Sequence, residues 1–255
     1  MAKVRLLQLG ALAVVLALWA LIAAAGLVSA TALPGPRAVA FALGDLLGSG
    51  GFWQAVGQTL RGAVTGLLVA VAVGVPVGLL TGVYEAAEES SRLLLEILRS
   101  FPVIALLPVF LLVLGSTPGM KATVVFLACV FPVLLQAQYG ARGVSRAVHE
   151  TVHAYRIPRL LSLRRVVLPA AAPSIMTGLR LAATTSVLVA IGVEVLTTLP
   201  GIGHMIMESQ AAGASARAYA YILTAGAIGH TITLLAQFAE HRLLAWRPPT
   251  RTGEE

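Results

Sequence analysis

Six long apolar stretches divide this chain, separated by shorter segments rich in polar residues, glycine or proline. The stretches run over residues 6–27, 62–83, 93–114, 122–139, 174–196 and 218–238. Each approaches the ~20 residues that an α-helix needs to cross the hydrocarbon core of a bilayer. The pattern therefore predicts an all-α membrane protein with six transmembrane helices.

The second stretch carries small residues at every fourth position. They are Gly62, Gly66, Ala70, Gly74, Gly78 and Gly82. A ridge without bulky side chains lets another helix approach to backbone contact, and spans often associate in this way in lipid. The pattern predicts a tight helix pair, either inside one subunit or between two subunits.

A dense polar insertion, Arg142 to Pro169, separates the fourth stretch from the fifth. Within it, an apolar stripe recurs at helical spacing, formed by Val144, Val148, Val152 and Tyr155. Pro158 follows and cannot continue a helix. We expect a short amphipathic helix here, joined to the next span by the basic stretch 159–165.

Composition agrees with a membrane protein, because 58% of the 255 residues are hydrophobic and only 11% are charged. Soluble domains carry about 25% charged residues. The net charge of +7 arises mainly from arginines on segments predicted to lie inside, which favours both termini in the cytoplasm. The basic excess is thus an orientation signal, and we expect no nucleic acid partner.

The insertion also contains His149-Glu150-Thr151-Val152-His153, which fits the H-E-x-x-H pattern of zinc hydrolases. Two histidines one helical turn apart could share a metal while Glu150 activates its water. No third ligand stands at a recognisable spacing. A membrane zinc metalloprotease is therefore the alternative function, and the pattern is short enough to arise by chance.

A second spacing begins at the same glutamate. Glu150-Thr151-Val152, three residues, Arg156, nine residues and then Val166-x-Leu168-Pro169 resembles the cytoplasmic loop of bacterial type I ABC importer permeases. In that family the loop reads E-A-A, three residues, G, nine residues, I-x-L-P. Arg156 replaces the glycine, which normally allows a tight turn after the first helix.

The resemblance extends outside the loop, to the nitrate, sulfonate and taurine branch of these permeases. Its landmarks are Arg99 to Pro108, Gly178 to Leu181, Glu194 and Gly201 to Gly203. The similarity covers about residues 59–240 of what we expect to be one permease domain, 1–255. It implies a cytoplasmic coupling helix between spans four and five and a place in the bacterial inner membrane.

The resemblance implies a subunit of an ATP-driven importer, not an enzyme. It would form the path for a small solute, such as an anion, a sulfonate or a related organic acid, delivered by a solute-binding protein. The expected partners are a second permease copy, two cytoplasmic ABC ATPase subunits, the binding protein and membrane lipids. ATP and magnesium would bind the ATPase, because neither Lys3 nor Lys121 follows a glycine as in a phosphate-binding loop. No cofactor or metal is expected in this chain.

The resemblance also assigns candidate residues. ATPase coupling would use Val148, Glu150, Val152, Tyr155 and Arg156, although a helix lying on the lipid surface is an alternative. The candidate translocation path consists of Pro102, Pro108, Thr184, Thr185, Ser186, Glu194 and Thr197. The outer gate and binding-protein contact would use Gly201, Gly203, His204 and Glu208. Glu194 is an intramembrane acid, so a hydrogen-bonded structural role is an equal alternative.

Overall fold

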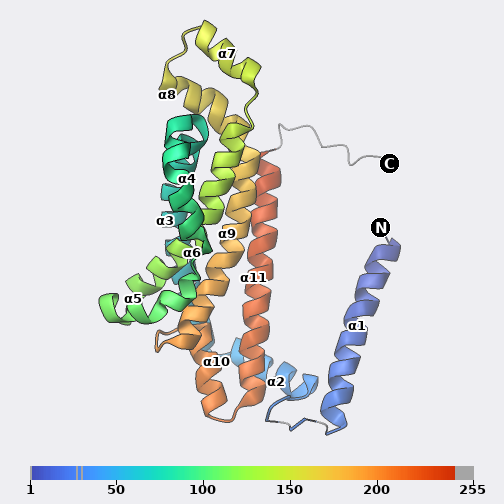
Figure 1. Ribbon diagram of the computed structural model, residues 1–255. Coiled ribbons are helices and arrows are strands. Elements are labelled where there is room, and N and C mark those ends of the chain that lie inside the picture. Colours follow the sequence, from blue (N-terminus) through green and yellow to red (C-terminus); the bar gives the residue numbers. More distant parts are fainter. Residues whose placement is uncertain (1, 27, 30, 245–255) are drawn as a thin grey trace. The chain divides into compact units, whose positions relative to one another are not determined.

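The structure is a computed structural model that describes residues 2–26, 28–29 and 31–244 (Figure 1). All regular elements in these ranges are helices. In chain order they are α1 (Ala2–Ala24), α2 (Pro36–Leu47), α3 (Gly50–Val83), α4 (Glu85–Ser100), the 3₁₀ helix η1 (Val103–Leu106), α5 (Leu107–Leu114), α6 (Pro118–Arg142), α7 (Arg146–Ala154), α8 (Arg159–Ser162), the π-helix η2 (Leu163–Val167), α9 (Leu168–Leu196), α10 (Ile202–Ala211) and α11 (Ser215–Leu243). The predicted all-α class is confirmed.

Four helices in the described ranges are long and apolar enough to cross a membrane: α3, α6, the continuous run from α8 to α9, and α11. A fifth candidate is the bent pair of α4 with η1 and α5. The predicted first span, 6–27, falls on α1, but Leu27 and several side chains of that helix lie outside the described residues. The count of six spans stays a prediction.

The predicted third span is not one continuous helix. α4 meets the segment Val103–Leu114 at an angle of 77°. Phe101 is extended, at φ −69° and ψ 127°, because the ring of Pro102 disfavours a helical residue before it. Pro108 lies in the first turn of α5, where its missing amide hydrogen is not needed. One proline therefore breaks the span and the other begins a new helix.

The chain divides into two compact units, and each contains segments that are far apart in the sequence. Unit 1 comprises Met1–Thr59 and Glu194–Ala227, and unit 2 comprises Leu60–Val193 and Ile228–Glu255. The units are therefore not successive domains along the chain, and each is described by itself.

In unit 2, the small-residue ridge of α3 packs against α6. A methyl group added to Gly66 would come within 2.6 Å of Val125 Cβ, and one added to Gly82 within 2.6 Å of Ala141 Cβ. Such spacing leaves no room for a side chain on the ridge. The ridge predicted from the sequence therefore makes its contact inside this chain.

Helix α9 lies between α6 and α11 in unit 2 (Figure 1). On the α6 side, the Cys129 thiol lies 3.3 Å from the Ala182 carbonyl oxygen. On the α11 side, Arg180 pairs with Glu240 at 3.1 Å. Polar contacts thus link α9 to both neighbours.

Unit 1 is held together by aromatic and hydrogen-bonded contacts between its two sequence segments. The rings of Phe52 and Tyr221 stack with their centroids 6.0 Å apart. The hydroxyl of Tyr219 donates to the Ala32 carbonyl oxygen at 2.9 Å. Residues 50–58 form the first turns of the 34-residue helix α3, which begins twelve residues before the predicted second span at Gly62.

Candidate coupling loop and outer gate

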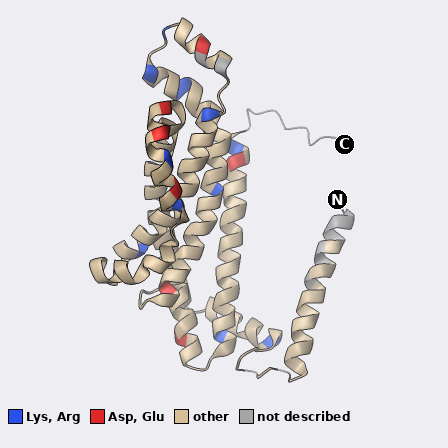
Figure 2. Ribbon diagram, in the orientation of Figure 1, with Lys and Arg blue, Asp and Glu red and all other residues tan. Residues whose placement is uncertain are grey.

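Helix α7 lies with α8 at one end of unit 2, where many charged residues also gather (Figures 1 and 2). None of the described side chains of α7 is buried, even the apolar side chains of Val148 and Val152. Val148 is 39% exposed, and Tyr155, which caps the helix, is 78% exposed. Val152 is partly buried and Glu150 is exposed. An apolar stripe left uncovered beside an acid is typical of a contact surface.

The turn after α7 places Arg156 in the left-handed region, at φ +50°. Of the residues described, it is the only one other than glycine with a positive φ. The Arg156 amide donates to the His153 carbonyl, and the Ile157 amide donates to the Val152 carbonyl, at 3.0 and 3.1 Å. This pair of bonds is the Schellman motif, whose left-handed position is usually glycine. The arginine therefore makes the turn that the family's glycine makes, and the helix ends before Pro158.

We expect Arg156→Gly to stabilise this turn by about 1 kcal/mol, because the left-handed conformation carries a penalty of that order for a residue with a Cβ. Hydrogen exchange at the amides of residues 156 and 157 should slow several-fold. Arg159→Gly, in α8, is the matched control and should not slow that exchange. Faster exchange at 156 and 157 in Arg156→Gly would contradict this account.

The basic stretch 159–165, which the sequence predicted only to join the amphipathic helix to the next span, is itself helical. α8 continues through η2 into α9, and the Leu168 amide donates to the Leu163 carbonyl. Val167 is buried among Leu79, Ala137 and Ala171, which come from α3, α6 and α9. Val167 therefore packs the loop directly against three helices.

The zinc interpretation finds no support in the side-chain geometry. No group of three or more His, Cys, Asp or Glu residues that could hold a metal ion occurs in the part of the chain that the structure describes. The side chain of His149 lies outside the described residues, and His153 is exposed. A hydrolytic zinc needs three protein ligands.

The residues predicted to form the outer gate lie beside Glu194, a predicted path residue whose side chain is fully buried in unit 1. Its Oε2 atom accepts hydrogen bonds from the Thr59 hydroxyl at 2.8 Å and the Gly203 amide at 3.0 Å. The Thr59 hydroxyl in turn accepts from the Ile202 amide at 2.9 Å. The Ile202 and Gly203 amides belong to the first turn of α10, where backbone N–H groups have no hydrogen-bond acceptor within the helix. Glu194 and Thr59 together cap α10.

Gly201 makes this cap possible. Its φ of +156° and ψ of −173° belong to a region open almost only to glycine, and a Cβ there would overlap the Glu194 carboxyl group. Gly203 is buried, His204 is partly buried and Glu208 is exposed. The four predicted gate residues thus lie on one short helix and the residue before it.

Thr59 was not selected from the sequence. It lies 135 residues before Glu194, and no motif surrounds it. The equal alternative for Glu194, a hydrogen-bonded structural role, matches the contacts observed.

The other candidate path residues do not share one environment. On α9, Thr184 is exposed and its hydroxyl lies 3.1 Å from that of Thr233 on α11, while Ser186 is buried and bonds to the Ala183 carbonyl. Thr185 is partly buried. Consecutive helical residues point about 100° apart, so these three cannot line the same surface.

Pro102 and Pro108 are both exposed, and Thr197 is partly buried after the end of α9. Pro102 lines an apolar cavity of about 360 Å³ in unit 2, together with Phe131 of α6 and Val189 of α9. The role of these residues in a path stays a prediction.

Comparison with known proteins gives a consistent assignment. Residues 74–245 match the family described as binding-protein-dependent transport system inner membrane component. The putative aliphatic sulfonates transport permease SsuC of Bacillus subtilis is 29% identical over 92% of this chain and 85% of its own length. The taurine transport permease TauC of Escherichia coli is 28% identical over 94% and 89%. The nitrate import permease NrtB of Leptolyngbya laminosa is 27% identical over 76% and 69%.

A solved structure supports the same fold. A chain of the MetNI methionine ABC transporter, in inward-facing conformations, superposes with a TM-score of 0.63 at 18% identity, covering 75% of this chain and 94% of that one. The family consists of transport subunits and not of enzymes, and none of the comparisons supports the zinc metalloprotease. The chain therefore belongs to the binding-protein-dependent transport system inner membrane components, in the branch of ABC importer permeases that includes the sulfonate, nitrate and taurine relatives.

Proposed function

We propose that this chain forms the translocation path of an ATP-driven importer for a small oxyanion, such as a sulfonate, or a related organic acid. The relatives named for sulfonates, taurine and nitrate support this solute class. The observation that carries the proposal is α7. It is an exposed helix with an uncovered apolar stripe, in a loop with the coupling-loop spacing of this family.

In this proposal, α7 is the coupling helix. Val148, Val152 and Tyr155 provide the apolar contact with a cytoplasmic ATPase, and Glu150 and Arg156 set its electrostatic register. Two permease copies pair, each with its own ATPase, and both chain termini lie in the cytoplasm. Closure of the ATPases on ATP moves α7, and Val167 transmits that movement to α3, α6 and α9.

The outer side carries the second contact. Gly201, Gly203, His204 and Glu208 form the gate and the surface for the solute-binding protein, with α10 held by Glu194. The spans then alternate between inward-open and outward-open states. The candidate path comprises Pro102, Pro108, Thr184, Thr185, Ser186, Glu194 and Thr197, and Glu194 contributes by holding the gate in position.

Glu150→Lys is expected to leave the protein in the membrane but to abolish solute uptake and stimulation of the partner ATPase. The reversed charge would stand in the centre of the docking surface, where a like-charge contact costs several kcal/mol. Membrane abundance, uptake and ATPase activity of the assembled complex are the measurements.

Glu89→Lys makes the same charge change on an exposed residue of α4, outside the loop, and should retain both activities. Normal uptake by Glu150→Lys would defeat the coupling assignment. An equal loss of uptake and ATPase stimulation in both variants would show a general effect of the charge change. That result would also contradict the coupling assignment.

A further inference from the structure

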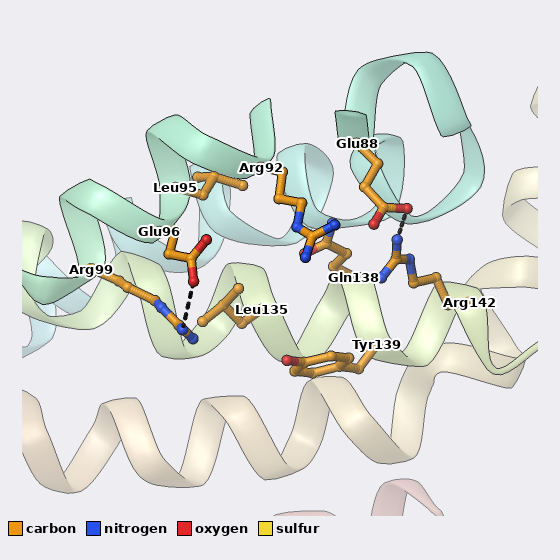
Figure 3. Close-up of a pocket in the computed structure, with 9 residues that line it drawn as sticks. All are labelled: Glu88, Arg92, Leu95, Glu96, Arg99, Leu135, Gln138, Tyr139 and Arg142. Atoms are coloured by element: carbon orange, nitrogen blue, oxygen red, sulfur yellow. Dashed lines mark ion pairs between the residues drawn. The ribbon is translucent and has the colours of Figure 1, made fainter. Parts of the chain in front are cut away.

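A second cavity of about 360 Å³ lies between α4 and α6 in unit 2 (Figure 3). Its α4 wall is polar, because Glu88, Arg92, Glu96 and Arg99 follow one another at three- and four-residue spacing. Arg142, in the last turn of α6, closes the end nearest the coupling loop. Arg99 lines both this cavity and the one beside Pro102.

The order of charges on α4 would suggest a simple ladder, because Arg92 stands four residues from both Glu88 and Glu96. The structure shows a different pairing. Glu88 forms its ion pair with Arg142 of α6, and Glu96 lies 3.9 Å from Arg99. Arg92 points into the space between the helices, and no ion pair or hydrogen bond of its side chain occurs in the described part of the chain (Figure 3). Arg92, which is exposed to solvent, is therefore a cation of the cavity whose neighbouring carboxylates are paired with other arginines.

Gln138 faces the same space from α6 (Figure 3). Its side chain is only 8% exposed, and within the described ranges its amide has no hydrogen-bond partner. No buried side-chain polar atom among the residues described lacks a partner, so the Gln138 amide must open onto the cavity. Tyr139, the next residue of α6, also lines the cavity. A nearly buried amide held at a cavity wall is positioned for a ligand.

We propose that this cavity binds a small oxyanion group, a sulfonate, sulfate or phosphate, held by Arg92 and Gln138. The guanidinium offers two parallel N–H donors to such a group, and the amide offers one more. Glu88 and Glu96 do not prevent this binding, because each carboxylate is paired with another arginine. An occupied site would link α4 to the last turns of α6, next to the coupling loop.

The proposal does not require transport activity and can be tested on the purified full-length chain in a neutral detergent. Sodium sulfate and sodium ethanesulfonate are titrated calorimetrically at constant ionic strength, and retention of phosphatidylglycerol is measured by native mass spectrometry. We expect one ion or one lipid per chain. Arg92→Gln should weaken that binding by at least about tenfold, because a charged hydrogen-bond donor is lost.

Arg165→Gln is the matched control, since it removes an exposed arginine outside the cavity and should leave binding unchanged. Gln138→Met keeps the side chain's size and removes its amide. It should weaken binding several-fold, and it provides the test of the proposal if Arg92→Gln does not fold. Binding of the soluble ions assigns the site to a free oxyanion, and retention of the lipid alone assigns it to a headgroup phosphate.

Absence of saturable binding by all three probes would overturn the proposal. Binding that Arg92→Gln and Gln138→Met leave within about twofold of wild type would overturn it as well, because such binding would lie elsewhere.

Discussion

Gly78→Ala is expected to prevent the close approach of α3 and α6 and to reduce folded protein sharply. The added methyl group would overlap the Leu134 carbonyl oxygen and come within 2.7 Å of Ala137 Cβ. A backbone atom cannot rotate away as a long side chain can, so the helices themselves must separate. Overpacking of this kind costs about 1–3 kcal/mol, and loss of contacts along the ridge adds to it.

Gly57→Ala is the control, because it lies in the same helix and a methyl group there meets nothing within 4 Å. Both substitutions raise helix propensity equally, so any difference between them comes from packing. Thermal unfolding in detergent, followed by size-exclusion chromatography, measures the effect. A melting temperature of Gly78→Ala equal to that of Gly57→Ala would contradict the contact.

Glu194→Leu is expected to destabilise the cap of α10 and to impair the outer gate. It would leave the Thr59 hydroxyl and the Gly203 amide without their buried acceptor. Each unsatisfied buried donor costs about 1–3 kcal/mol, so the change should rank among the most damaging single substitutions in unit 1. Thermal unfolding and uptake by the assembled complex are the measurements.

Glu194→Gln retains one oxygen acceptor and nearly the same volume, so its loss of stability should be smaller. Thr59→Val removes the hydroxyl that links Glu194 to the Ile202 amide. A double-mutant cycle of Thr59→Val with Glu194→Gln should show coupling, because the two residues share one hydrogen-bond network. Additive effects would show that the cap does not act as a unit. If Glu194→Leu were as stable as the wild type, Glu194 would have no role in capping α10.

The elements that follow from local periodicity were predictable. The stripe of Val148, Val152 and Tyr155 indicates a helix, because steps of four and three residues match a 3.6-residue period and not the two-residue period of a strand. Helix α7 indeed occupies Arg146–Ala154. The ridge of Gly66 to Gly82 likewise required a close helix partner. The sequence could not show that this partner is α6, because a ridge of small residues predicts that some helix packs closely but not which one.

Three features of the candidate sites could not be predicted from the sequence. Glu194 is identifiable as an intramembrane acid, but its bond to Thr59 joins residues 135 positions apart. The spacing on α4 predicts that Arg92 pairs with Glu88, but Glu88 forms its ion pair with Arg142 of α6. The left-handed Arg156 departs from the family's glycine, and only the backbone shows that the turn is nevertheless retained.

The helical class, most of the apolar helices, helix α7 of the polar insertion and the resemblance to importer permeases were all predictable from the sequence. Hydropathy and periodicity are properties of continuous stretches of about 20 residues or fewer, so they can be read directly along the chain. Only the folded chain shows that α3 packs on α6, that the third span bends by 77° at Pro102, and that the carboxyl group of Glu194 caps α10. Packing and hydrogen-bond partners are chosen by proximity in space, which a linear pattern does not contain.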